Sequence, residues 1–217
     1  MTGLPATNVI PLPLAADDWP RPPRAAAFTG LAGDIVSAIE PHSESDPLAI
    51  LAQLLVCFGS AIGRGAHYAV EATEHHANEF AVLVGPSAKA RKGSSWDHVQ
   101  RIFSQVDPDW AQRRIVSGLC SGEGLIWSVR DPDTTARARD RTTDEENDQD
   151  KRLLVLEAEF ASVLKMVARD GNTLSPVVRC AWDGKPLQAL TKNSPARATG
   201  AHIAIVGHIT ADELSGS

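Results

Sequence analysis

The sequence predicts an α/β fold with a mostly parallel central sheet. Three short apolar runs have the length of buried strands, at residues 79–84, 153–156 and 202–206. Stretches whose apolar residues recur at helical spacing lie between them. Buried parallel strands form continuous apolar runs, and helices must connect them, so this alternation indicates a parallel sheet with helices on its faces.

The elements follow in order along the chain. Residues 1–24 contain six prolines, so residues 1–27 are predicted to be a proline-rich arm or linker, with a partner-docking peptide as the alternative. A helix is predicted over residues 28–40. A second, buried helix should start at Asp46 and Pro47, because Asp is a favoured N-cap and Pro a favoured first residue. Further predictions are a strand at 67–72, a helix at 95–106 and a helix at 160–168.

Composition excludes several classes of protein. Hydrophobic residues make up 43% of the 217 residues, which is typical of a globular chain, and aromatic residues only 5%, too few for a base-stacking surface. The formal charge of −6 argues against an extended basic groove. Residues 131–150 hold eight acids and three arginines, and are predicted to be an acidic mobile loop. Three dispersed cysteines, the lack of a signal peptide and the lack of a long apolar run predict a reduced, cytoplasmic protein with no membrane span.

The first chemical motif is AVLVGPSAKARKGSSW, residues 81–96. A buried strand, a glycine, a basic loop and the start of a helix form the layout of a phosphate cradle, in which backbone N–H groups and a lysine face an anion and a hydroxyl reaches Mg²⁺. The match to GxxxxGK[ST] is imperfect, because Lys92 comes one place late, Arg91 replaces the second glycine and Gly93 precedes Ser94. An ordinary basic turn between strand and helix is the alternative.

Two further motifs place polar residues at strand ends. In RLLVLEAEFASVL, residues 152–164, a buried strand ends at Glu157 and Glu159. Carboxylates at this edge of a parallel sheet can hold Mg²⁺ or position water, although acids that merely begin a helix are the alternative. In HIAIVGHITADEL, residues 202–214, His208 follows a third buried strand and is either a γ-phosphate sensor or an ordinary loop histidine.

Together these segments resemble a P-loop primase–helicase-like family of bacteria, phages and mobile elements with a RecA-type ATPase core. The matching pieces are VGPSAKARKGSSW, IVSGLCSGEGLIWSVRD, LEAEFASVLKMVARDGNTLSPVVRCAWDG and ATGAHIAIVGHITADEL. The resemblance implies a RecA-like P-loop ATPase domain over residues 28–217, preceded by the proline-rich arm and incomplete at its C-terminus. It also implies ATP and Mg²⁺ as cofactors, single-stranded DNA as a partner and a homo-oligomeric ring.

The resemblance also assigns roles. Lys92 would contact the β- and γ-phosphates, Ser94 or Ser95 would assist Mg²⁺, Glu159 would be the catalytic acid and His208 the sensor. The predicted nucleotide-binding set is Gly85, Lys89, Arg91, Lys92, Gly93, Ser94 and Ser95, with Ser94 and Glu157 at the metal. Ala158 stands where the family has its metal-associated acid, and Glu157 is the possible replacement. Segment 121–123 is expected near the nucleotide or a neighbouring subunit, and Arg179 and Asp183 in an intersubunit contact or a surface ion pair.

The predicted function is therefore the ATP-binding domain of a helicase-like protein in DNA replication or a mobile element, with ATP hydrolysis in the assembled state. The resemblance leaves two alternatives open. A truncated regulatory or structural module would retain the fold without hydrolysis, which Ala158 favours. A kinase-like phosphotransferase would use the same loop but needs an acceptor site and a lid.

Overall fold

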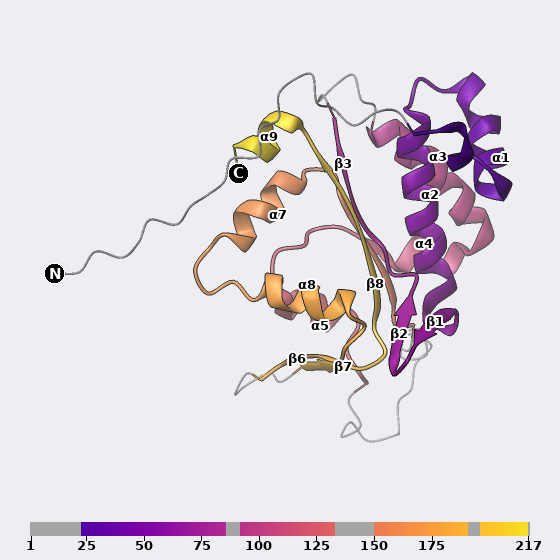
Figure 1. The fold of residues 1–217 in the computed structure, drawn as a ribbon. Coiled ribbons are helices and arrows are strands. Elements are labelled where there is room, and N and C mark those ends of the chain that lie inside the picture. The colour runs from indigo at the N-terminus through magenta and orange to yellow at the C-terminus, as the bar shows by residue number, and fades with distance from the viewer. Residues whose placement is uncertain (1–22, 86–91, 133–149, 191–195, 217) are drawn as a thin grey trace.

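A computed structural model describes residues 23–85, 92–132, 150–190 and 196–216 (Figure 1). At its centre is a four-stranded sheet with the order β3-β8-β5-β4, formed by Phe80–Val84, His202–Ile209, Arg152–Glu157 and Ile115–Val116. Every neighbouring pair in this sheet is parallel. The predicted α/β class with a parallel core is thus confirmed, and the three apolar runs are its three longest strands.

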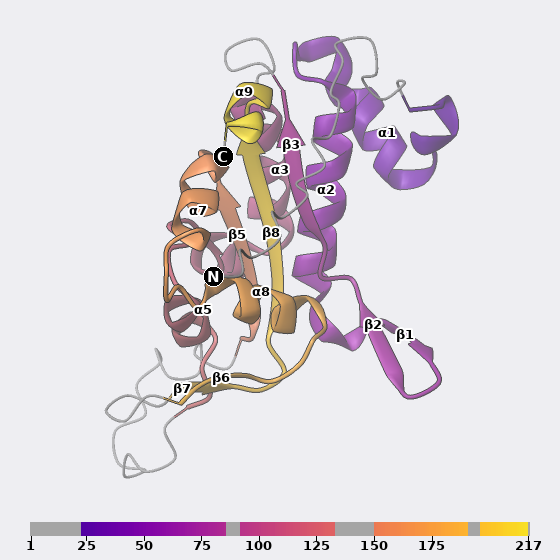
Figure 2. The same ribbon diagram turned by 60° about the vertical axis from the view of Figure 1, so that its left-hand side comes forward.

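Helices cover both faces of the sheet and make three layers (Figures 1 and 2). One face carries α1 (Gly30–Ile39), α2 (Pro47–Ile62), α3 (Lys92–Val106) and α4 (Pro108–Arg113). The other face carries α5 (Gly122–Ser128), α7 (Phe160–Val167) and α8 (Leu174–Trp182). A short α9 (Ala211–Ser215) follows β8. Each face has its own hydrophobic core, so the sheet separates two clusters of buried side chains.

Strand β8 is the centre of the molecule. All eight of its residues are buried, since it pairs with β3 on one side and β5 on the other. Its side chains alternate between the two cores: Ala204 and Val206 join the α2/α3 side, while Ile203 and Ile205 join the α5/α7/α8 side. A strand buried on both faces is mostly apolar, which explains the run Ile203–Val206, while the two histidines of β8 are buried with hydrogen-bond partners.

Two small antiparallel hairpins lie outside the main sheet. The first pairs β1 (His67–Val70) with β2 (Thr73–His76), and the second pairs β6 (Leu187–Ala189) with β7 (Ala196–Ala198). The prediction of a single strand over residues 67–72 is wrong at its C-terminal end. The first strand stops at Val70, and the chain reverses at Glu71, whose φ of 53° lies in the left-handed region. Short 3₁₀ turns at Ala25–Ala27, Glu40–His42 and Gly63–Gly65 complete the described elements.

Helix α2 is the apolar helix that the sequence predicted to be buried, and it forms part of the core. The expectation that the chain lacks a long apolar run is wrong, because Pro47–Gly65 is long and apolar enough to cross a membrane by length and composition; in the structure it is a core helix, and 56% of its 18-residue apolar window is buried. It packs on α1, α3 and the sheet. Its start follows the prediction: the Asp46 side chain accepts a hydrogen bond from the Leu48 N–H at 2.8 Å, and Pro47 is the first residue.

Several predicted segments fall partly or wholly outside the described residues. The proline-rich arm does so up to residue 22, and the acidic segment does so over 133–149. The two ends of that acidic segment are described and are well anchored. Asp131 accepts hydrogen bonds from Thr199 and pairs with Lys151 at 3.2 Å, while Asp150 pairs with Arg152 at 2.7 Å.

Candidate functional site

The carboxyl ends of β3, β8 and β5 lie side by side at one edge of the sheet, because these strands are parallel neighbours (Figure 1). Each strand ends in one of the three motifs singled out in the sequence. Gly85 follows β3, Glu157 ends β5, and β8 ends at Ile209 with His208 just before it. In open parallel sheets, ligands bind in the crevice beyond this edge.

Lys92, the first residue of α3, lies at the seam between β3 and β8. Its Nζ donates hydrogen bonds to the carbonyl oxygens of Gly85 at 3.0 Å and Ile209 at 2.9 Å. The two strand ends are themselves joined by a bond from the Gly85 N–H to the Ile209 carbonyl. Burial lowers the pKa of the Lys92 ammonium, and the Glu213 carboxylate acts in the opposite direction. A half-buried cation is thus fixed at the edge where an anionic ligand would arrive.

The first turn of α3 adds polar groups beside this cation. Gly93 and Ser94 are exposed, whereas Ser95 is buried. The Ser95 hydroxyl donates to the Lys92 carbonyl at 2.8 Å, so it faces the protein interior. Of the two serines predicted to assist Mg²⁺, only Ser94 therefore has a side chain exposed to solvent. Lys89 and Arg91, the other predicted contacts, lie outside the described residues.

A buried hydrogen-bond chain connects the start of α3 to the end of β8. The Gln53 amide nitrogen donates to the Ser95 hydroxyl at 2.7 Å and to the Ala49 carbonyl at 2.9 Å. Its amide oxygen lies 2.9 Å from Nε2 of His208. Because that oxygen only accepts, the His208 Nε2 must carry the proton. We name this His208–Gln53–Ser95 set the polar chain.

His208 does not project from the sheet edge. Only 4% of it is exposed, and it faces α2 across the first core. Burial, together with the positive charge of Lys92, lowers the pKa of His208 to about 4, so the ring is neutral near pH 7. The predicted strand-tip sensor is thus a buried side chain next to Lys92, and any action on a ligand would pass through the polar chain and the α3 turn.

The two predicted acids have very different surroundings. Glu157 is buried, and its Oε1 accepts the N–H groups of Gly118 at 2.7 Å and Leu119 at 2.5 Å. One carboxylate oxygen therefore fixes the loop after β4, which leaves Glu157 poorly placed as an open magnesium ligand. Glu159 is exposed at the start of α7, and its side chain makes no capping bond there. Of the two, Glu159 is the one accessible from solvent.

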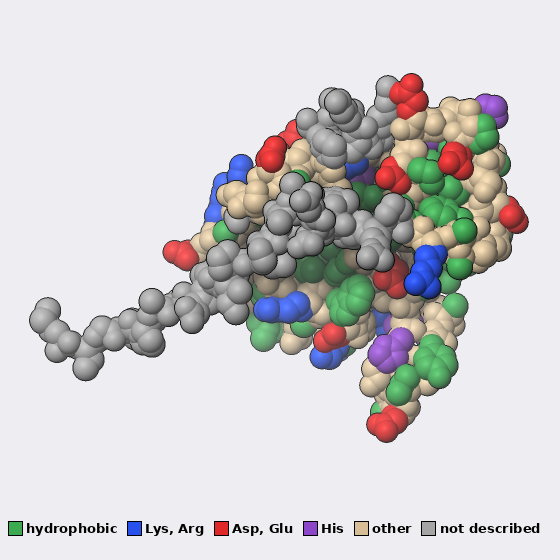
Figure 3. All heavy atoms as spheres, turned by 45° about the horizontal axis from the view of Figure 1, so that its top comes forward, with side chains coloured by type: hydrophobic (Ala, Val, Ile, Leu, Met, Phe, Trp, Pro, Cys, Tyr) green, Lys and Arg blue, Asp and Glu red, His purple; other side chains and the backbone are tan. Residues whose placement is uncertain are grey.

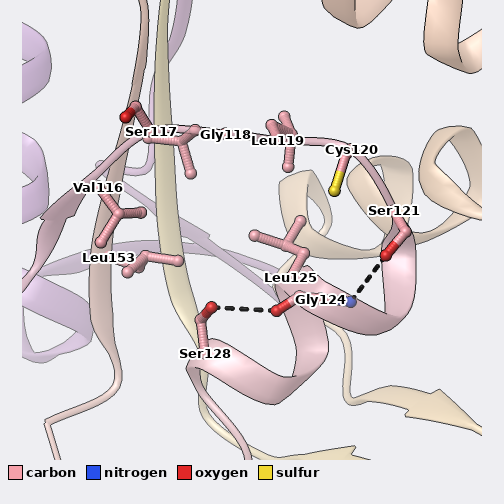
Figure 4. A pocket seen from close by; sticks show the side chains of 11 residues that line it. Val116, Ser117, Gly118, Leu119, Cys120, Ser121, Gly124, Leu125, Ser128 and Leu153 are labelled. Carbon is pink, nitrogen blue, oxygen red and sulfur yellow. Dashed lines mark hydrogen bonds between the residues drawn. The ribbon is translucent and has the colours of Figure 1, made fainter.

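A pocket is lined by the loop that follows β4 and by residues of β4, β5 and α5 (Figure 4). It lies on the β4 side of the sheet, whereas Lys92 lies at the seam between β3 and β8. Its lining combines aliphatic side chains with serine hydroxyls: Val116, Ser117, Gly118, Leu119, Cys120, Ser121, Gly124, Leu125, Ser128, Leu153 and Val155. Ser121 accepts from the Gly124 N–H at 3.0 Å and so caps α5. Glu123 accepts from the Thr173 hydroxyl at 2.7 Å. Segment 121–123 thus holds α5 against α8.

The predicted Arg179–Asp183 ion pair does not form within the described residues. Asp183 pairs instead with Lys185 at 2.8 Å, and both side chains are largely exposed. The residues share only a backbone bond, from the Asp183 N–H to the Arg179 carbonyl at the end of α8. The surface ion pair in this segment therefore has a different cation.

Gln53 is the site residue that sequence reasoning missed. Its signal was present, since it is a lone amide within the otherwise apolar run LAILAQLLVC. A polar side chain buried in a helix core needs a partner, and that partner lies 42 positions later in the sequence. Comparison with protein-family models, with curated proteins and with solved structures found no match to this chain.

Proposed function

We propose that the Lys92 edge of the sheet binds the polyphosphate of a nucleotide, ATP with Mg²⁺ in the first place. The observation that carries the proposal is the position of Lys92 at the joined ends of two parallel strands. An arriving phosphate can replace the two backbone carbonyls that the ammonium contacts now. Charge-assisted bonds to phosphate are stronger than bonds to neutral carbonyls, so this exchange is favourable.

The residues present fit a phosphate group better than they fit a metal ion. The 15-residue helix α3 directs its first N–H groups towards the edge, and its first turn also carries the exposed hydroxyl of Ser94. Mg²⁺, when bound, would neutralise phosphate charge and would draw on Ser94 and on water. Glu157 contributes little to such a site while its oxygen holds the two loop amides.

A second candidate is nucleotide binding without hydrolysis, in a regulatory or structural module. Two observations favour it: Glu157 is bound to backbone amides, and Ala158 has no carboxylate. A phosphate-release assay with saturating Mg·ATP separates this module from an ATPase, and the same assay with single-stranded DNA tests stimulation.

The wider function that we propose comes from the sequence resemblance alone. It is that of a RecA-like, ring-forming, DNA-stimulated cytoplasmic ATPase. The four-stranded parallel sheet flanked by helices is compatible with a RecA-like core. Figure 3 shows acidic and basic side chains interspersed on the described surface of one face. A DNA partner would therefore meet local basic groups rather than a continuous basic surface on that face.

The first test is calorimetric titration of Mg·ATP into the protein and into Lys92→Ala. Loss of the ammonium should weaken binding about tenfold to a hundredfold, because charge-assisted contacts contribute roughly 1.5–3 kcal/mol. Lys89→Ala, in the same basic segment, is the matched control and should have a smaller effect. Equal affinity of the wild type and Lys92→Ala, with unchanged melting temperature, would refute the nucleotide site.

A further inference from the structure

A second cluster of chemically capable side chains lies at the opposite end of the molecule, on the β1–β2 hairpin that projects from the body (Figure 2). In this hairpin, His67 pairs with His76 and Ala69 pairs with Glu74. Residues opposite each other, and residues two apart along a strand, share a face. His67, Glu74 and His76 therefore lie on one face, while His75, opposite Tyr68, lies on the other.

These three side chains converge. One ligand atom from each lies within 4.8 Å of the others. A Glu74 oxygen is 3.5 Å from Nε2 of His76, and the second Glu74 oxygen is 3.9 Å from Nε2 of His67. Ligands at about 2.1 Å around a tetrahedral ion are separated by about 3.4 Å. The separations of 3.5 and 3.9 Å are near that value, and the whole set lies within 4.8 Å, so the three side chains can reach one ion by rotating towards it.

An independent observation concerns His76. Its side chain is only 4% exposed, yet neither ring nitrogen has a hydrogen-bond partner among the described residues. A buried polar atom without a partner costs stability, so such an atom indicates a missing ligand. The Arg64 carbonyl lies near enough to favour the protonated ring, but its geometry makes no hydrogen bond.

The surroundings of His76 favour its neutral form, in which a ring nitrogen can bind a metal ion. Burial, followed by the charges of Arg64 and His67, lowers the pKa of His76, while Glu74 and the Arg64 carbonyl act in the opposite direction. His202, at the start of β8, stands edge-on to His76 with ring centroids 6.4 Å apart. Its Nε2 lies 2.8 Å from the Gly59 carbonyl, so this neighbouring ring is fixed by the body of the protein.

We propose that His67, Glu74 and His76 bind one divalent transition-metal ion, with Zn²⁺ as the preferred ion. Two imidazoles and one carboxylate suit zinc better than Mg²⁺ or Ca²⁺, which favour oxygen ligands. Three protein ligands leave a fourth tetrahedral position for water or an external ligand. The carboxylate neutralises part of the ion's charge.

This zinc site is separate from the proposed nucleotide site. The hairpin meets the amino end of β8, whereas Lys92 contacts the carboxyl end. Seven residue steps separate His202 from Ile209, which is about 23 Å of extended strand. The two proposals therefore stand or fall separately, and each can be measured without the other.

The test is a Zn²⁺ titration by calorimetry, with Co²⁺ absorption in the visible region as a report of tetrahedral nitrogen and oxygen ligands. Wild type should bind one ion, and zinc should raise its melting temperature by mass action. His67→Ala and Glu74→Gln should each weaken zinc affinity by about tenfold or more. Loss of a residue that merely hydrogen-bonds to a metal ligand already lowers metal affinity about tenfold or more, and loss of the ligand itself should lower it at least as much. Both residues are exposed, so folding should be retained.

His75→Ala is the matched control, since it removes a histidine from the other face of the same strand. It should leave zinc affinity unchanged, and His67→Ala should leave Mg·ATP affinity unchanged. No zinc uptake by wild type would overturn the proposal. So would equal zinc affinity in wild type and His67→Ala, or a loss in His75→Ala as large as that in His67→Ala.

Discussion

At the scale of single residues, the polar chain is the feature that gives the site its geometry. His208, Gln53 and Ser95 come from β8, α2 and α3, and each hydrogen bond between them lies in the core. In a low dielectric these bonds are strong, and an unpaired member would cost about 1–3 kcal/mol. The chain therefore holds the first turn of α3, and with it Lys92, in a fixed relation to the end of β8.

The depressed pKa of His208 predicts a stability that depends on pH. The unfolded chain takes up a proton near pH 6.5, whereas folded His208 does so at about 4. Folded protein is therefore favoured above pH 6.5, and stability falls as the pH drops towards 4. Urea unfolding should be measured at pH 7.5 and at pH 5. On this drop in pH, the free energy of unfolding of His208→Gln should fall by about 2 kcal/mol less than that of the wild type.

The Gln side chain can also donate to Gln53, so this variant should still fold. His76 and His202, whose pKa values are also lowered, remain in both proteins and cancel in the comparison. Identical pH dependence in wild type and His208→Gln would show that folding does not lower the pKa of His208.

The place of Lys92 at the strand ends could be predicted from sequence, because a residue that follows a buried strand and starts a helix must lie at the carboxyl edge of the sheet. Prediction worked less well for Glu157, whose partners are backbone amides of a loop 38 to 39 positions earlier. It failed for Gln53, because side-chain partners across the core depend on packing between distant elements. Of the proposed zinc ligands, only His67 lay within a predicted strand, at residues 67–72, while Glu74 and His76 lie in β2, which was not predicted.

At the scale of elements, the close approach of α7 to β8 depends on Gly207. A Cβ at this position would lie 2.6 Å from Cδ2 and 2.7 Å from Cγ of Phe160, the first residue of α7. Helix α7 follows directly after Glu159, so this contact also places the exposed acid. A residue with any side chain at position 207 would force the helix or the ring to move.

Gly207→Ala should lower the free energy of unfolding by about 1–3 kcal/mol, because overpacking a core forces such shifts. Urea denaturation gives this value directly. Gly65→Ala is the control, since a Cβ there meets no atom within 4 Å, and it should be nearly neutral. The double variant with Phe160→Ala should lose less than the sum of the two single changes. A neutral Gly207→Ala would mean that α7 packs farther from β8.

The long apolar strands and strongly periodic helices were predictable because burial imposes their patterns directly. The two-residue β4 and the short α4 and α5 were not predicted, since such short elements carry too few periodic residues, and α8 was also not predicted although it is as long as α7. Helix α3 starts at Lys92 rather than at the predicted 95. Three polar residues precede its apolar face, and so hydrophobic spacing alone could not place the boundary.

At the scale of the whole molecule, the acidic segment joins two anchored ends. Asp131 contacts Thr199 and Lys151, and the Arg152 guanidinium contacts both Asp150 and Asp107. Although burial alone would raise the pKa of each acid, these partners lower it overall for Asp131 and Asp150. Because Lys151 lies against Asp131, the two ends are already close in space, and a short connection can join them.

Replacement of residues 134–148 by a short Gly/Ser linker should therefore change the free energy of unfolding by less than about 1 kcal/mol, since loop-closure entropy varies slowly with length. Thermal unfolding measures this. Asp131→Ala should instead cost about 1–3 kcal/mol through its lost hydrogen bonds. A large drop in melting temperature for the linker variant would show that the acidic segment itself packs on the core.

The central place of β8 determines the order in which this protein can be completed on the ribosome. Strands β3 and β5 leave the exit tunnel first, and in the finished sheet they do not pair with each other. Only when residues 202–209 emerge can Phe80 meet Ile205 and Leu154 meet Ala204. Such distant pairings form slowly. Throughout that interval the edges of β3 and β5 that face β8 lack their partner strand, and unpaired apolar edges of this kind make a nascent chain prone to misassembly.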